Sequence, residues 1–130
     1  MRIFDSRNNL IAMVIRNKTN KFSKTFYSEQ EDELQVGKFK LKKNEEIIRH
    51  FHPENKRSIN NTTEVLIVLK GKLKVNLFDN LKKFLQEIEI YEEDILVLFS
   101  GGHQILVLED CEFIEVKQGP YNEYKDKVRF

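Results

Sequence analysis

Short runs of β-branched and other apolar residues, bounded by turn residues, constrain the fold of this chain more than any other feature. Apolar residues recur at a spacing of two, the period of a β-strand, and no segment of helix length carries a clean amphipathic stripe. The chain is therefore expected to be all-β. The pattern predicts strands over residues 9–16, 24–27, 34–42, 46–52, 64–70, 72–78, 84–91, 95–99, 104–108 and 112–117.

Turn residues separate these runs, for example at Gly71 and at Gly101-Gly102. Many short strands at this spacing favour a β-sandwich or a barrel such as a jelly roll. Residues 53–63 are polar and contain a proline and three asparagines, which predicts one long surface loop rather than a linker. We therefore expect a single domain over residues 1–130.

Charge and cysteine usage narrow the possible partners and compartment. The chain has 22 Lys and Arg residues against 21 Asp and Glu residues, so there is no electrostatic case for binding nucleic acid or an anionic membrane. No apolar run approaches the length of a transmembrane helix. Cys111 is the one cysteine, which excludes an intrachain disulfide, and three acids beside it disfavour a thiolate. We expect a cytoplasmic protein.

The three histidines and one glutamate form a pattern typical of a metal site. His50 and His52 are two residues apart, so on a strand they would face the same point. Glu64 is the first residue of the apolar run 64–70 and shares the expected inward face of that strand with Leu66 and Val68. Gly101-Gly102 allows the chain to bend and bring His103 close to Glu64. Three imidazoles and a carboxylate suit a divalent transition metal (Fe, Mn, Ni or Zn) with open coordination positions.

Simpler interpretations of these residues are also open. His50 and His52 could lie on a surface strand without binding metal. Glu64 could be a strand-edge acid paired with Lys70 or Arg57, although an unpaired inward carboxylate would be costly beside apolar neighbours.

The same residues resemble the two motifs of the cupin superfamily. These are His50-Phe51-His52 with a downstream Glu64 ahead of Gly71, and a glycine-containing turn before His103. The resemblance implies one cupin domain, a double-stranded β-helix or jelly-roll barrel, with the four residues as metal ligands. Eleven residues separate His52 from Glu64, where the cupin spacer is much shorter. In the second motif, residues 99–103 differ from the usual Pro-x-Gly-x-x-His and Glu93 replaces the first glycine.

Residues 113–121 resemble the Glu-Val-Lys-x-Gly-Pro-Tyr ending of the WbuC-like cupin-fold metalloproteins. Those proteins are associated with bacterial surface-polysaccharide biosynthesis, so the resemblance implies a role with a sugar or a sugar derivative. Cupins are commonly homodimers, and the strand at 64–70 is apolar on both faces, so we also expect a homodimer.

Four further residues are candidates for chemistry or substrate binding. Glu115 and Lys117 would share a strand face, as acid/base machinery or as a structural ion pair. Arg57 could clamp a carboxylate or phosphate from the long loop, or be an ordinary solvated charge. Tyr121 is a candidate substrate contact, and a packing role at the barrel rim is the commoner use of such a residue.

The leading hypothesis is a metal-dependent enzyme that acts on a small polar molecule, as an isomerase, epimerase or oxygenase. The alternative is a non-catalytic metal- or carbohydrate-binding module. A weaker possibility is a metal that only stiffens the barrel.

Overall fold

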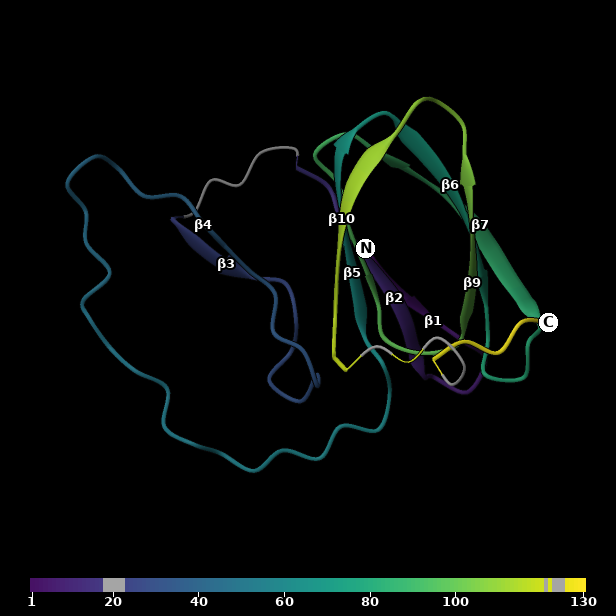
Figure 1. The fold of residues 1–130 in the computed structure, drawn as a ribbon, viewed down its shortest axis with the longest axis horizontal. Helices are drawn as coiled ribbons and strands as arrows, with labels where there is room; N and C mark the ends of the chain where they lie inside the picture. The colour runs from purple at the N-terminus through teal and green to yellow at the C-terminus, as the bar shows by residue number, and fades with distance from the viewer. Residues whose placement is uncertain (18–22, 121, 123–125) are drawn as a thin grey trace. The chain divides into compact units, whose positions relative to one another are not determined.

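The computed structural model describes residues 1–17, 23–120, 122 and 126–130. The chain divides into two compact units (Figure 1). The first unit contains Met1–Asn17 and Asn61–Phe130, and the second unit is Lys18–Asn60. The regular structure of the described residues is entirely β with antiparallel pairing, so the prediction of an all-β protein is confirmed. The single domain over residues 1–130 stays a prediction.

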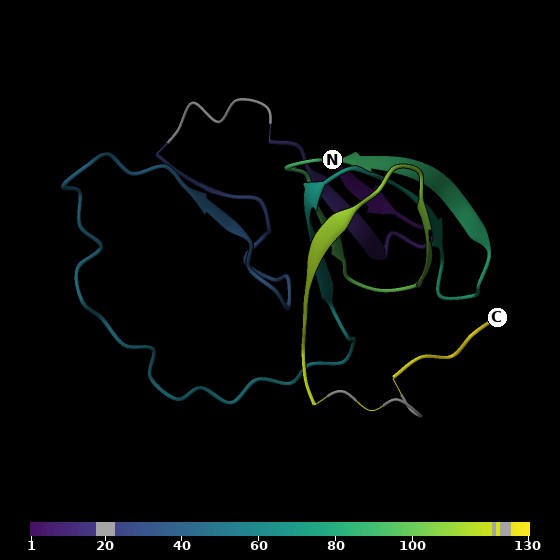
Figure 2. The same cartoon turned by 45° about the horizontal axis from the view of Figure 1, so that its top comes forward.

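The described residues of the first unit form two antiparallel sheets. The larger has the strand order β1-β2-β8-β5-β10. These strands are β1 (Arg2–Phe4), β2 (Leu10–Ile15), β8 (Ile95–Leu98), β5 (Glu64–Lys70) and β10 (Glu112–Lys117). The smaller has the order β7-β6-β9, with β7 (Phe84–Tyr91), β6 (Lys72–Phe78) and β9 (Gly102–Val107). The sheets form two layers (Figure 1 and Figure 2), and the described residues show no closed barrel.

The core lies between these two layers. In β5 and β6 buried residues alternate with more exposed ones, as the period-two pattern predicts, whereas β2 is buried along nearly its whole length. Both sheets contribute to the same buried cluster, with Leu66 and Leu96 from the larger sheet and Leu77 and Ile90 from the smaller. Burial of these side chains holds the sheets face to face, since each fully buried aliphatic side chain contributes about 1.5–3 kcal/mol. From β9, the partly buried Ile105 packs against this cluster.

Gly71 closes the turn between β5 and β6. Its φ is +85°, and a Cβ atom there would lie 2.2 Å from the carbonyl oxygen of Asp110. Only glycine allows both this left-handed conformation and the close backbone approach. The strands β5 and β6 follow each other in the chain, and this turn leads from the larger sheet into the smaller one.

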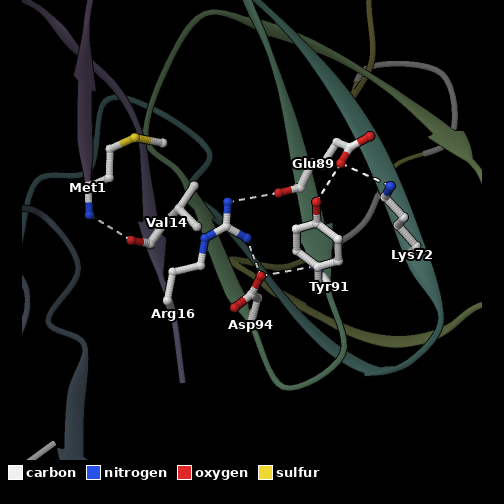
Figure 3. Close-up of polar contacts among 7 residues, drawn as sticks. All are labelled: Met1, Val14, Arg16, Lys72, Glu89, Tyr91 and Asp94. Atoms are coloured by element: carbon white, nitrogen blue, oxygen red, sulfur yellow. Dashed lines mark hydrogen bonds and ion pairs between the residues drawn. The ribbon is translucent and has the colours of Figure 1, made fainter. Parts of the chain in front are cut away.

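A polar network connects β2 with the β6–β7 hairpin (Figure 3). Arg16 forms an ion pair with Asp94 and donates a hydrogen bond to the carbonyl of Glu89 at 2.9 Å. The Glu89 carboxylate accepts a hydrogen bond from the Tyr91 hydroxyl and lies 2.9 Å from Lys72 Nζ. Tyr91 and Lys72 therefore lower the pKa of Glu89 below its ordinary value. The network ties the larger sheet to the smaller one.

Among its described residues, the second unit contains one hairpin, β3 (Lys24–Phe26) with β4 (Gly37–Phe39). Its second strand is much shorter than the predicted 34–42. The strand predicted over 46–52 is wrong, because residues 46–60 have no regular secondary structure. Ile48 and Phe51 are 76% and 84% exposed, so this stretch lacks the buried face and the hydrogen-bonded neighbour that stabilise a strand. Conversely, β1 was not predicted.

Candidate functional site

Glu64 is a buried carboxylate at the first position of β5. It shares the inward face of the strand with Leu66 and Val68, as the alternation predicts. Its cross-strand neighbours are Leu98 of β8 and Lys117 of β10. The carboxylate thus lies at the end of the core, where β5 begins.

His103 reaches the same point from the smaller sheet. It is the second residue of β9 rather than part of the preceding turn, and it lies opposite the buried Leu77 of β6, which places it on the inward face. Its Nε2 lies 3.2 Å from Glu64 Oε2. The hydrogen bond from His103 lowers the pKa of Glu64, and this effect outweighs the opposing effect of burial. Glu64 is therefore held ionised.

Lys117 lies among three carboxylates. Its Nζ is 3.7 Å from Glu64 Oε1, 3.5 Å from Glu115 Oε1 and 3.7 Å from Asp126 Oδ2. Burial acts to lower the pKa of Lys117, but Glu115, Glu64 and Asp126 together raise it. The predicted pair Glu115 and Lys117 does share the inward face of β10, because the register sets Glu115 opposite Leu66 and Lys117 opposite Glu64.

A cleft of about 840 Å³ opens beside this cluster. Glu64 and His103 line it, together with the turn at Ser100–Gly102 and the residues 126–130. A cleft of this volume is in the range of small-molecule sites. The carboxylate and imidazole therefore face a space that a small ligand could enter.

Residues 126–130, termed here the C-terminal arm, form part of the cleft lining. The Phe130 ring packs edge-to-face on Phe78, with centroids 5.3 Å apart, and Lys82 Nζ lies 5.3 Å from the Phe130 centroid. A Cβ atom on Gly102 would lie 2.7 Å from Phe130 Cζ, so the absence of a side chain at Gly102 makes room for this ring. Sequence reasoning did not single out the arm, because its packing depends on residues far away in the chain.

His50, His52 and Arg57 belong to the second unit. The two imidazole rings have centroids 5.2 Å apart, and His50 Nδ1 lies 2.9 Å from the carbonyl oxygen of Ile48. All three side chains are exposed, and none lies on a regular strand. The rings therefore lie close together, but through the local course of the chain rather than through the strand alternation that was predicted.

Tyr121 lies outside the described residues. Cys111 packs against the core, and burial raises the pKa of its thiol, which disfavours a reactive thiolate.

The donor set of the first unit fits part of a metal site. The Glu64 carboxylate and the His103 imidazole are suitable donors, and their ligating atoms face each other. Within the described ranges, no three His, Cys, Asp or Glu side chains are grouped so that they could hold a metal ion. A metal would thus require donors in addition to this pair.

Comparison with protein-family models, with curated proteins and with solved structures found no significant match. In the part of the chain that the structure describes, no helix is long and apolar enough to cross a membrane.

Proposed function

We propose that this protein is a cupin-type jelly roll in which His50, His52, Glu64 and His103 bind a divalent transition metal. The observation that carries the proposal is the 3.2 Å contact between Glu64 and His103 beside the cleft. Two donors of the expected types meet there, from strands of different sheets, at the positions that the cupin-like motifs assign to ligands.

The free edge of β9 supports a route by which His50 and His52 could join this pair. In the described residues β9 pairs with β6 alone, so its other side offers unpaired backbone groups. Residues 46–52 carry exposed apolar side chains and would gain a hydrogen-bonded neighbour by adding to that edge as a strand. On such a strand His50 and His52 would share one face, the arrangement that a common metal ion requires.

The proposed activity is that of a metal-dependent enzyme acting on a small polar molecule such as a sugar or sugar derivative. When bound, the metal would supply a Lewis acid for a carbonyl or hydroxyl group, or a centre for oxygen activation. Glu115 and Lys117 lie 3.5 Å apart on the inward face of β10, where they could move a proton during isomerisation or epimerisation. The proposal includes a link to surface-polysaccharide biosynthesis, and this link is based only on the resemblance of residues 113–121 to the WbuC-like ending.

The alternative function is a non-catalytic metal- or carbohydrate-binding module. The exposed cleft supports binding of a small molecule under either interpretation. Incubation of the metal-loaded protein with sugars that raise its thermal midpoint separates the two, because an enzyme alters the sugar and a binding module returns it unchanged.

We also propose that the protein forms a homodimer through the outward face of β5 and β10. Leu69, Ile114 and Val116 on that face are 44%, 46% and 53% exposed, so a second copy could bury apolar surface there. Light scattering of the Ile114→Lys/Val116→Lys variant tests this: a dimer that persists unchanged contradicts the proposed face.

The metal proposal is tested by metal analysis of the wild-type protein and of the double variant His50→Ala/His52→Ala. Loss of two ligands is expected to weaken metal binding by more than the roughly 10- to 100-fold typical for loss of a supporting residue. Arg49→Ala is the matched control, because on a strand Arg49 would point away from the histidine face. Equal metal content in the double variant and the wild type would overturn the assignment.

A further inference from the structure

The acidic side chains in the cleft already have cationic or hydrogen-bonding partners. Glu64 contacts His103 and Lys117, at 3.2 Å and 3.7 Å. Asp126 lies 3.7 Å from Lys117 and accepts a hydrogen bond from the Asn122 backbone at 3.2 Å. Their negative charges are thus compensated within the protein.

The cationic side chains on the C-terminal arm differ from these acids in their ion pairing. Lys127 and Arg129 both line the cleft, and within the described residues neither forms an ion pair. Lys82, whose Nζ lies 5.3 Å from the Phe130 ring centroid, contributes a third cation to the same lining. In the described part of the cleft, Lys127 and Arg129 thus form no direct ion pair, although the charge of Lys127 acts on Glu64, whereas Glu64 and Asp126 each lie within 3.7 Å of Lys117.

The arm that carries these cations is anchored. Phe130 occupies the space above Gly102 and packs on Phe78, which sets the arm against the strand that bears His103. Lys127 and Arg129 precede this anchor by only a few residues, so the position of the ring limits where their side chains can reach.

From these observations we infer that the cleft contains an anion subsite, formed by Lys127 and Arg129 of the C-terminal arm, for a small soluble carboxylate or phosphate monoester. A guanidinium group can bind either anion through two parallel hydrogen bonds, and a lysine ammonium adds a point charge. The subsite does not require a metal. If the proposed function holds, the ligand of this subsite is the substrate of the enzyme. The substrate would then be a sugar that carries a carboxylate or a phosphate group.

Three probes of similar size test the subsite: glucuronate, glucose 6-phosphate and neutral glucose. Binding is measured by calorimetry on chelator-treated protein at low salt. At least one acidic probe is expected to bind about tenfold or more tightly than glucose, in line with the strength of charge-assisted hydrogen bonds. The first two probes distinguish a carboxylate from a phosphate ligand. Equal binding of glucose, or no binding of either acidic probe, would overturn the proposal.

Variants assign the effect to the arm. Lys127→Gln/Arg129→Gln is expected to remove most of the preference for the acidic probe, while Lys42→Gln/Lys43→Gln removes the same charge from the second unit and should preserve it. Gly102→Ala should weaken binding with all cations retained, because its Cβ would displace the Phe130 ring. Circular dichroism checks that each variant is folded. A preference that survives in the arm variant contradicts the subsite.

This experiment is separable from the test of the metal site. If acidic probes bind but His50→Ala/His52→Ala retains its metal, the proposed metal function fails and the subsite stands. If metal binding depends on the histidines but acidic probes do not bind, the subsite alone fails.

Discussion

Glu64 Oε2 and His103 Nε2 lie 3.2 Å apart, on inward-facing positions of strands that belong to different sheets. The contact lies at one end of the core, between the first residue of β5 and the second residue of β9. It holds a buried carboxylate ionised next to a cleft.

Two isosteric substitutions separate a ligand from an acid/base group. Glu64→Gln is expected to lower metal affinity by more than about tenfold, because an amide oxygen is a weaker donor than a carboxylate. Glu115→Gln should keep the metal and lower the turnover of an identified substrate by about 10²- to 10⁴-fold. Metal titration and steady-state kinetics measure the two effects. Unchanged metal affinity in Glu64→Gln would exclude this carboxylate as a ligand.

Hydrogen exchange tests whether residues 46–52 add to the edge of β9. In the metal-free protein their amides should exchange rapidly, since this stretch has no regular secondary structure. Addition of metal is expected to slow exchange both there and along Gly102–Val107, because new backbone hydrogen bonds would form between them. Residues 53–60 serve as an internal control. Metal binding without added protection at 46–52 would contradict the strand addition.

Core packing predicts contrasting effects of two leucines on β5. Leu66 is 1% exposed and belongs to the core, so Leu66→Ala should reduce the free energy of unfolding by about 2–5 kcal/mol. Leu69 is 44% exposed on the other face, and Leu69→Ala should cost much less. Urea denaturation of the metal-free monomeric protein gives both values. Similar losses for the two variants would contradict the contrast between a core position and an exposed one.

The pKa of Glu89 predicts a specific pH dependence of stability. Tyr91 and then Lys72 lower this pKa below the ordinary value of 4.5, so the ionised carboxylate stabilises the folded state. Its contribution is complete above pH 4.5 and is lost as the pH falls below that value through the lowered pKa. Denaturation of Glu89→Gln should accordingly show a shallower loss of stability on acidification than wild type. Glu92→Gln is the exposed control, and identical slopes for wild type and Glu89→Gln would contradict this role.

The residues of the site differ in how far the sequence could place them. The inward position of Glu64 and the shared face of Glu115 and Lys117 follow from alternation within predicted strands, a local property of the backbone. The 3.7 Å approach of Lys117 to Glu64 does not, because it depends on the pairing of β5 with β10, which are distant in the chain. His50 and His52 show the limit of local patterns, since a strand-like sequence without a pairing partner did not form a strand.

By itself the sequence determined the all-β class, most strand positions and the inward direction of Glu64, because side-chain alternation and turn residues act over a few neighbouring positions. The tertiary structure alone decided the meeting of Glu64 with His103, the three carboxylates around Lys117 and the packing of Phe130 over Gly102. These contacts join residues far apart in the chain. They form only once the burial of a common core has set the two sheets face to face.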